Sequence, residues 1–125
     1  MLLLIAGLVI AMTYSDQPEP WPVPDKYEHM KSPVANDSDA ISIGKTLYNQ
    51  HCKSCHGKEG YGDGSKAAQL DTPAGDFSDP DFQAQSDGAI FYKSKIGRDE
   101  MPSFEKKIPN DEDIWSVVCY LRSFE

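Results

Sequence analysis

Residues 49 to 60 read NQHCKSCHGKEG, and this stretch contains Cys52, Cys55 and, directly after the second cysteine, His56. Two thiols separated by two residues can form a redox-active dithiol, supply half of a structural zinc site, or attach a haem covalently. The three kinds of site differ in what they need elsewhere in the chain. The remaining sequence therefore decides between them.

A structural zinc ion needs four ligands, usually from a second pair of cysteines or histidines. Beyond the motif only Cys119, His29 and His51 remain, and no two of them form such a pair. A thioredoxin-like dithiol is expected after a strand of a βαβ unit, whereas the residues before Cys52 have a helical pattern. Zinc and dithiol stay open as alternatives, but Cys-x-x-Cys-His is the attachment signature of c-type haem.

The motif thus predicts one covalently bound haem c. Cys52 and Cys55 would bond its vinyl groups, and His56 would be one axial ligand of the iron. Such a site leaves the second axial position to another side chain. The chain offers five candidates for that position: Met12, His29, Met30, His51 and Met101.

Met101 is the best of these candidates. It lies in GRDEMPSF, a charged loop between two helical segments where an apolar filler residue is not expected, and Pro102 stiffens the chain after it. Met12 belongs to an apolar leader, His29 and Met30 belong to a proline-rich linker, and His51 is expected to point away from the far face of the haem. We therefore expect His56 and Met101 to be the axial ligands.

The pattern of the chain around these residues predicts helices and no strands. A helix is expected over residues 39–52, capped by Ser38 or Asp39, and another over residues 86–96, ended by Gly97. A short helix is expected near residues 65–70 in a glycine-rich middle. The clearest helix begins after Asn110 and buries a stripe at helical spacing, formed by Ile114, Val117, Val118 and Leu121.

The domain is therefore expected to be all-α, with three to four helices. About 85 residues with long loops bury little apolar surface, so a bound haem would supply the missing core. Cys119 lies off the buried stripe of the last helix, and we expect a partly exposed free thiol without a functional role.

Residues 1–15 and 16–40 differ from the rest of the chain. Residues 2–12 form an uninterrupted apolar run, which is short for a membrane span and typical of a signal peptide or the end of an anchor. Residues 16–40 are acidic and rich in proline, which favours an extended polyproline arm; the alternative is a segment that packs over the domain through Trp21 and Tyr27. The predicted domain is residues 41–125.

The 125 residues carry a formal net charge of -8, with 39% hydrophobic and 26% charged residues. This composition is typical of one soluble globular domain. Nucleic acid is excluded as a partner because phosphate backbones attract basic surfaces. Three cysteines are too few for a disulfide framework.

The chain resembles class I c-type cytochromes of the bacterial monohaem kind. The resemblance covers residues 41–125 and rests on CKSCHG, GDG, MPSF and the terminal IWSVVCYLRSF. It implies that the first and last helices cross at right angles, with Gly44 allowing their close approach beside Tyr48 and Tyr120. It also implies that a proline carbonyl accepts the Nδ1 proton of His56, and Pro73 in DTPAGDF is the matching residue.

The function expected from the motif and the resemblance is one-electron transfer in an extracytoplasmic respiratory or related redox chain, not catalysis. The partners would be redox proteins, and the protein would be periplasmic, with residues 1–15 as a possible membrane anchor. A second hypothesis is a gas-binding or sensing haem domain, for which Met101 would have to be a core residue. A third is a permanent subunit of a membrane complex, in which the arm at residues 16–40 provides reach.

Overall fold

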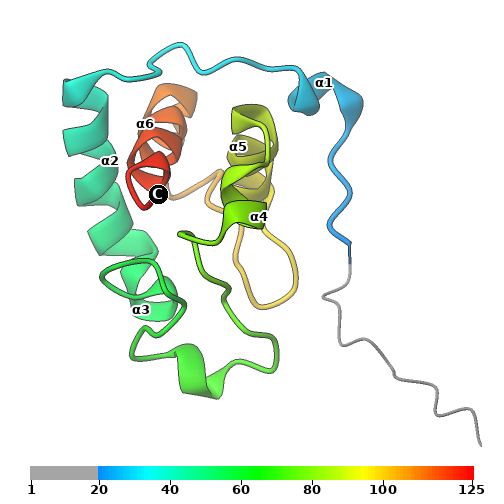
Figure 1. Ribbon diagram of the computed structural model, residues 1–125, viewed down its shortest axis with the longest axis vertical. Coiled ribbons are helices and arrows are strands. Elements are labelled where there is room, and N and C mark those ends of the chain that lie inside the picture. The colour runs from blue at the N-terminus through cyan, green and yellow to red at the C-terminus, as the bar shows by residue number, and fades with distance from the viewer. Residues whose placement is uncertain (1–19) are drawn as a thin grey trace, which may run out of the picture.

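The structure, a computed structural model, describes residues 20–125, and its regular elements there are helices (Figure 1). The leader at residues 1–15 and the first part of the linker lie outside the described residues. Three longer helices form the body: α2 (Ser38–His51), α5 (Asp87–Ile96) and α6 (Asp111–Arg122). Shorter elements are α1 (Asp25–Glu28), α3 (Lys53–His56), η1 (Ala67–Gln69) and α4 (Pro80–Gln83). The expectation of an all-α fold is confirmed.

The N-cap of helix α2 lies before both residues that were expected to cap it. Asp37 is the N-cap, and its Oδ1 accepts hydrogen bonds from the backbone N–H groups of Asp39 (2.8 Å) and Ala40 (3.2 Å). A carboxylate at this position also suits the positive end of the helix dipole. The prediction of Ser38 or Asp39 as the cap was therefore wrong by one or two residues.

The closest helix packing is between α2 and α6, which lie side by side in Figure 1. A Cβ atom on Gly44 would lie only 1.9 Å from the carbonyl oxygen of Ser116, so the two backbones meet where α2 has no side chain. Next to this point, the ring of Tyr48 meets the ring of Tyr120 edge to face, with centroids 5.2 Å apart. These are the residues that the resemblance assigned to the helix crossing.

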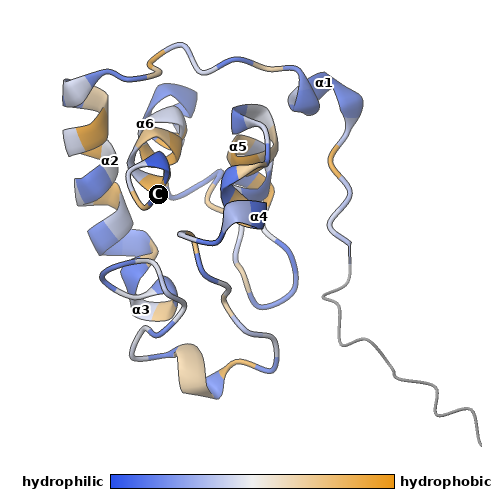
Figure 2. Ribbon diagram, in the orientation of Figure 1, coloured by the Kyte–Doolittle hydropathy of each residue, from blue (hydrophilic) through white to orange (hydrophobic). Residues whose placement is uncertain are grey.

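Helices α5 and α6 confirm their predicted boundaries. Ser86 caps α5, Gly97 ends it, and Asn110 caps α6. Figure 2 shows hydrophobic residues on α5 and α6, whereas α1 is hydrophilic. All four residues of the predicted stripe on α6 are buried. The full set of buried residues on this helix is Ile114, Trp115, Ser116, Val117, Val118, Cys119 and Leu121.

The N-terminal segment at residues 20–37 packs over the domain, as the second of the two interpretations proposed. Tyr27 of α1 contacts Tyr92 of α5, with ring centroids 4.7 Å apart. The guanidinium of Arg98 lies 4.6 Å from the ring centre of Trp21 and donates a hydrogen bond to the carbonyl of Pro20 (2.9 Å). In this conformation the described part of the linker does not extend away from the domain as a reaching arm.

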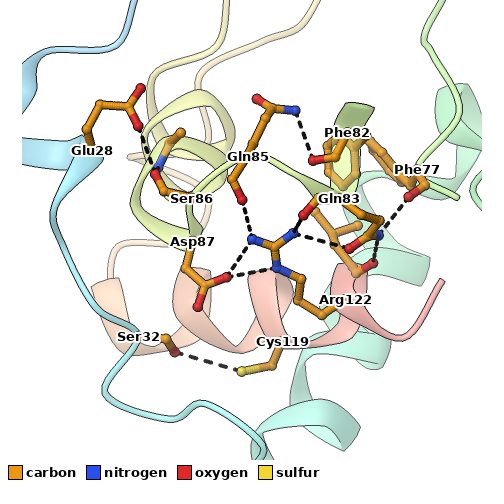
Figure 3. A network of polar contacts seen from close by, with 12 residues as sticks. Glu28, Ser32, Phe77, Phe82, Gln83, Gln85, Ser86, Asp87, Cys119 and Arg122 are labelled. Atoms are coloured by element: carbon orange, nitrogen blue, oxygen red, sulfur yellow. Dashed lines mark hydrogen bonds and ion pairs between the residues drawn. The ribbon is translucent and has the colours of Figure 1, made fainter. Parts of the chain in front are cut away.

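Arg122 ties the C-terminal end of α6 to the chain around α4 and α5 (Figure 3). Its Nε donates to the carboxylate of Asp87 at 2.8 Å, and its two terminal nitrogens donate to the carbonyls of Gln83 (2.7 Å) and Gln85 (2.6 Å). The partly buried ion pair with Asp87 thus connects α5 to α6.

None of the helices within residues 20–125 combines the length and the hydropathy that a membrane crossing requires.

The expectation of a partly exposed Cys119 is wrong. Its side chain is buried, with 7% of its surface exposed, and its thiol donates a hydrogen bond to the carbonyl of Val34 (3.1 Å). Ser32 contacts the same sulfur (Figure 3). The helical pattern of α6 predicts only which face of the helix packs against the core. Cys119 lies on another face of α6, and the N-terminal segment covers that face.

We expect the Cys119 thiol to react slowly in the folded protein. Burial raises its pKa, so little reactive thiolate is present, and the segment at residues 32–34 blocks access. With Cys52 and Cys55 bonded to haem, labelling by a thiol reagent should be at least roughly a hundredfold slower in buffer than in denaturant, because it requires local opening. Equal rates in the two conditions would show that the segment does not cover the sulfur.

Candidate functional site

The CKSCH motif forms a tight turn at the end of α2. Helix α3 begins directly after Cys52, and the loop that follows binds back to it: the N–H of Gly62 donates to the carbonyl of His56 (2.8 Å), and the N–H of Gly64 donates to the carbonyl of Cys55 (3.1 Å). These bonds satisfy carbonyls that a four-residue helix leaves without partners. The GDG sequence therefore stabilises the motif itself.

Tyr48 anchors the other end of this turn. Its side chain is fully buried, and its hydroxyl donates a hydrogen bond to the carbonyl of Gly57 at 2.6 Å. Burial raises the pKa of this hydroxyl, so it stays protonated and can donate. The same tyrosine that packs at the helix crossing thus fixes the position of the residue that follows His56.

The ring of His56 is held by stacking rather than by a hydrogen bond. It lies parallel to the ring of Phe77, with centroids 4.5 Å apart and planes 23° apart. Burial lowers the pKa of His56 to about 4, and the nearby backbone of Ala74 partly offsets this shift. The imidazole is therefore neutral at pH 7, which is the form that binds a metal.

The Nδ1 atom of His56 is buried and has no hydrogen-bond partner among the described residues. The predicted partner, the carbonyl of Pro73, belongs to the residue before Ala74, and Pro73 lines the same cavity as His56. The role of Pro73 stays a prediction. Nδ1 is the atom for which the resemblance implies a proline carbonyl as acceptor, so a metal would bind the other ring nitrogen, Nε2.

Met101 lies at the end of a four-residue turn after α5. Its N–H and carbonyl both pair with Arg98 at 2.9 Å, which forms an isolated antiparallel bridge. Gly97 lies under this turn with a φ of +70°, and a Cβ atom there would lie 2.5 Å from the carbonyl oxygen of Met101. A glycine at the end of α5 therefore lets the methionine backbone fold back closely.

The predicted site residues line two cavities that share four side chains: Cys52, His56, Met101 and Phe104. The larger cavity has a volume of about 250 Å³ and also includes Cys55 and Pro73, whereas the smaller one of about 30 Å³ extends into the core. Apolar side chains of α6 line the inner part, among them Ile114, Val117 and Leu121. The motif and Met101, 45 residues after His56, thus border one space, and the residues present fit a haem.

Of the rejected candidates for the second axial position, Met12 lies outside the described residues, and two of the other three lie away from the cavities. Met30 packs against the hydrophobic core and His29 is exposed; neither lines the cavities. His51 does line the larger cavity, beside Phe104 at a ring distance of 5.9 Å. His51 does not line the smaller cavity, which Met101 also borders, and its expected direction away from the far face of the haem stays a prediction.

The structure gives little support to the two other chemistries of the motif. Burial raises the pKa of Cys52 to about 12, the reverse of the lowered pKa of a redox-active thiol. Within residues 20–125, no group of three or more histidine, cysteine or acidic side chains is placed to hold a metal ion. Cys119, the third cysteine, is held by Val34 and Ser32.

Several residues that shape the site were not predicted. Phe77 and Phe104 each lie within a loop, so no periodicity placed them at the cavity. Trp21 lines the larger cavity from the N-terminal segment, some 30 residues before the motif. The hydrogen bond from the Tyr48 hydroxyl to the carbonyl of Gly57 was not predicted either. The resemblance assigned Tyr48 only to aromatic packing at the helix crossing.

Comparisons with known proteins agree with this geometry. Over 125 aligned residues, the chain is 29% identical to the quinohemoprotein alcohol dehydrogenase ADH IIB of Pseudomonas putida; the match covers 94% of this chain but only 16% of that protein. Among solved structures, it is similar to the Kuenenia stuttgartiensis reducing HAO-like protein complex, with a TM-score of 0.66 and 27% identity over 85% of this chain and 51% of the other.

A second solved structure, the KustC0563 c-type cytochrome, has a TM-score of 0.56 and 32% identity over 66% of this chain and 96% of its own length. The chain therefore spans nearly all of a small c-type cytochrome but only a part of the larger relatives. Residues 39–121 match the family described as cytochrome C oxidase, cbb3-type, subunit III. Because this match covers well over half of the sequence, the chain belongs to that family of cytochrome c domains.

Proposed function

We propose that this domain is a one-electron carrier whose haem is attached through Cys52 and Cys55, with His56 and Met101 as the axial ligands of the iron. The observation that carries the proposal is that these four residues, from two separate parts of the chain, line one cavity. Membership of the cytochrome c family implies haem-based electron transfer. When bound, the haem supplies the ferrous/ferric couple.

The chain's own residues would fix the cofactor and control its surroundings. The stacked ring of Phe77 orients His56, and the Arg98 turn presents Met101. The apolar side chains of α6 exclude water from the inner face, and a thioether ligand favours the ferrous form and raises the reduction potential. With both axial positions filled by side chains, substrates have no open coordination site, so we propose transfer rather than catalysis.

We further propose that the protein works outside the cytoplasm, in a respiratory or related redox chain, and exchanges electrons with protein partners. The apolar run at residues 2–12 supports export or anchoring. Similarity to part of an alcohol dehydrogenase and to part of a multi-protein complex supports a role beside a larger oxidoreductase. A domain of this kind serves equally as a free carrier or as a subunit.

Absorption spectra test the ligand assignment. The oxidised wild-type protein should show a weak sulfur-to-iron charge-transfer band in the near infrared, and Met101→Ala should abolish it, lower the potential and allow the ferrous iron to bind carbon monoxide. Met30→Ala is the matched control, because Met30 packs against the core away from the cavities, and it should retain the band. A wild-type protein that binds carbon monoxide readily would instead favour the gas-binding alternative.

A further inference from the structure

Glu100, the residue before Met101, makes the hydrogen bonds that connect the methionine turn to a distant loop. Its carboxylate accepts from the backbone N–H of Asp71 (3.0 and 3.1 Å to its two oxygens) and from the N–H of Thr72 (3.0 Å). We propose that Glu100 is a positioning residue that clamps the Met101 turn onto the loop at residues 71–74. This inference rests on the proposed ligation by Met101.

The two segments that Glu100 joins lie on the wall of the same cavity. The larger cavity is lined by Thr72, Pro73 and Ala74 from one loop, and by the turn at residues 98–102 from the other. The first loop also lies near His56, because Pro73 and Ala74 line the same cavity as that imidazole. The clamp therefore connects the histidine side of the proposed haem site to the methionine side.

The other hydrogen bonds of the turn reach different parts of the chain, among them the bond from the Arg98 guanidinium to the carbonyl of Pro20, and Glu100 joins the turn to the loop at residues 71–74. The N–H and carbonyl of Met101 both pair with Arg98, and these bonds set the shape of the turn. After the turn, the N–H of Phe104 donates to the carbonyl of Lys95 (3.1 Å) and attaches the chain to α5. Glu100 supplies the attachment on the opposite side, to a loop 28 to 29 residues away in sequence.

The neighbouring acidic residues do not duplicate this role. Asp99 forms an ion pair with Arg98 (3.7 Å), within its own turn. Glu105 is exposed, as Glu100 is, but within the described residues its carboxylate accepts no hydrogen bond, and its backbone N–H bonds to Ser103. Hydrogen bonds from two successive N–H groups to one carboxylate are charge-assisted and require a specific geometry. Removal of Glu100 should therefore loosen the turn more than removal of Glu105.

A looser turn should let an added ligand compete better with the sulfur of Met101. We expect ferric Glu100→Ala to bind imidazole about tenfold more tightly than the wild type, which corresponds to about 1.4 kcal/mol. Glu100→Gln keeps one acceptor oxygen without the charge and should lie between the two. Glu105→Ala, which removes the same charge four residues after Met101, should stay within about twofold of the wild type.

The measurement is a titration of the purified ferric haem protein with imidazole, followed by loss of the near-infrared band. An unchanged affinity in Glu100→Ala, with the band present in the wild type, would overturn the clamp alone, and so would an equal shift in Glu105→Ala. A drop in denaturant stability without a shift in imidazole affinity would mean a merely structural role and would also overturn it. A wild-type protein without the band would overturn the Met101 ligation as well.

Discussion

Replacement of both Cys52 and Cys55 by serine is expected to yield a chain without covalent haem that has lost most of its helical circular dichroism. The side chains that face the smaller cavity, among them Phe104, Ile108 and Ile114, would then border empty space or water. Burial of one such side chain contributes about 1.5–3 kcal/mol, so exposure of several would cancel most of a typical stability of about 5–15 kcal/mol.

The control for this experiment is Cys119→Ser, which changes the third cysteine away from the cavity. It should keep covalent haem and most of the wild-type helicity, because a hydroxyl can still donate to the carbonyl of Val34. The readouts are haem that stays with the chain after denaturing electrophoresis, and the far-ultraviolet spectrum. A double serine variant that keeps native helicity without haem would contradict the view that the cofactor completes the core.

The features predicted best from the sequence are local ones. Helix α6 was placed by the cap at Asn110 and by apolar residues at helical spacing, and α5 was placed by its end at Gly97. The CKSCH motif is likewise a contiguous signal, and its chemistry follows from residue types and spacing alone. Each of these depends on interactions within about one helical turn, which a linear pattern records directly.

Apart from the cap of α2, the predictions that were wrong depend on contacts between distant segments. The burial of Cys119 comes from residues 32–34, more than 80 residues earlier in the chain, and no pattern within α6 could reveal that cover. The same segment brings Trp21 to the cavity. The alternating prolines there were consistent with an extended arm or a packed one, because proline restricts the backbone without specifying what it contacts.

The site shows the same division. Met101 could be chosen by elimination among five candidates, and the structure places it in both cavities with His56. The stacking of Phe77 on His56 and the bonds of Glu100 could not be foreseen, because both join loops whose course no periodicity defines. The sequence thus indicates the candidate residues for the proposed chemistry, and the tertiary contacts explain how these residues are held in place.

The helix crossing connects these two levels, because α2 carries the residues that lead into the motif. Gly44 lies against Ser116 of α6, and one turn later Tyr48 bonds to Gly57 at the end of the motif. Any change that separates α2 from α6 should therefore also displace the turn that presents His56. This coupling makes Gly44 a sensitive position outside the cavity.

Gly44→Ala should destabilise the haem protein by about 2 kcal/mol or more, and Gly44→Val by more still. The new Cβ atom would lie 1.9 Å from the carbonyl oxygen of Ser116 and 3.0 Å from Cβ of Tyr120, so the helices must move apart. Overpacking of this kind costs about 1–3 kcal/mol or more, which outweighs the gain of up to about 1 kcal/mol from alanine's helix propensity.

Denaturant titration of the two variants beside Lys45→Ala, an exposed change on the same helix, measures the effect. The Lys45 variant should stay within about 0.5 kcal/mol of the wild type, and its haem content should be unchanged. If Gly44→Ala were as stable as the Lys45 variant, α2 and α6 could not cross as closely as Gly44 and Ser116 do in this structure. The position of the motif would then have to depend on contacts other than the helix crossing beside Tyr48.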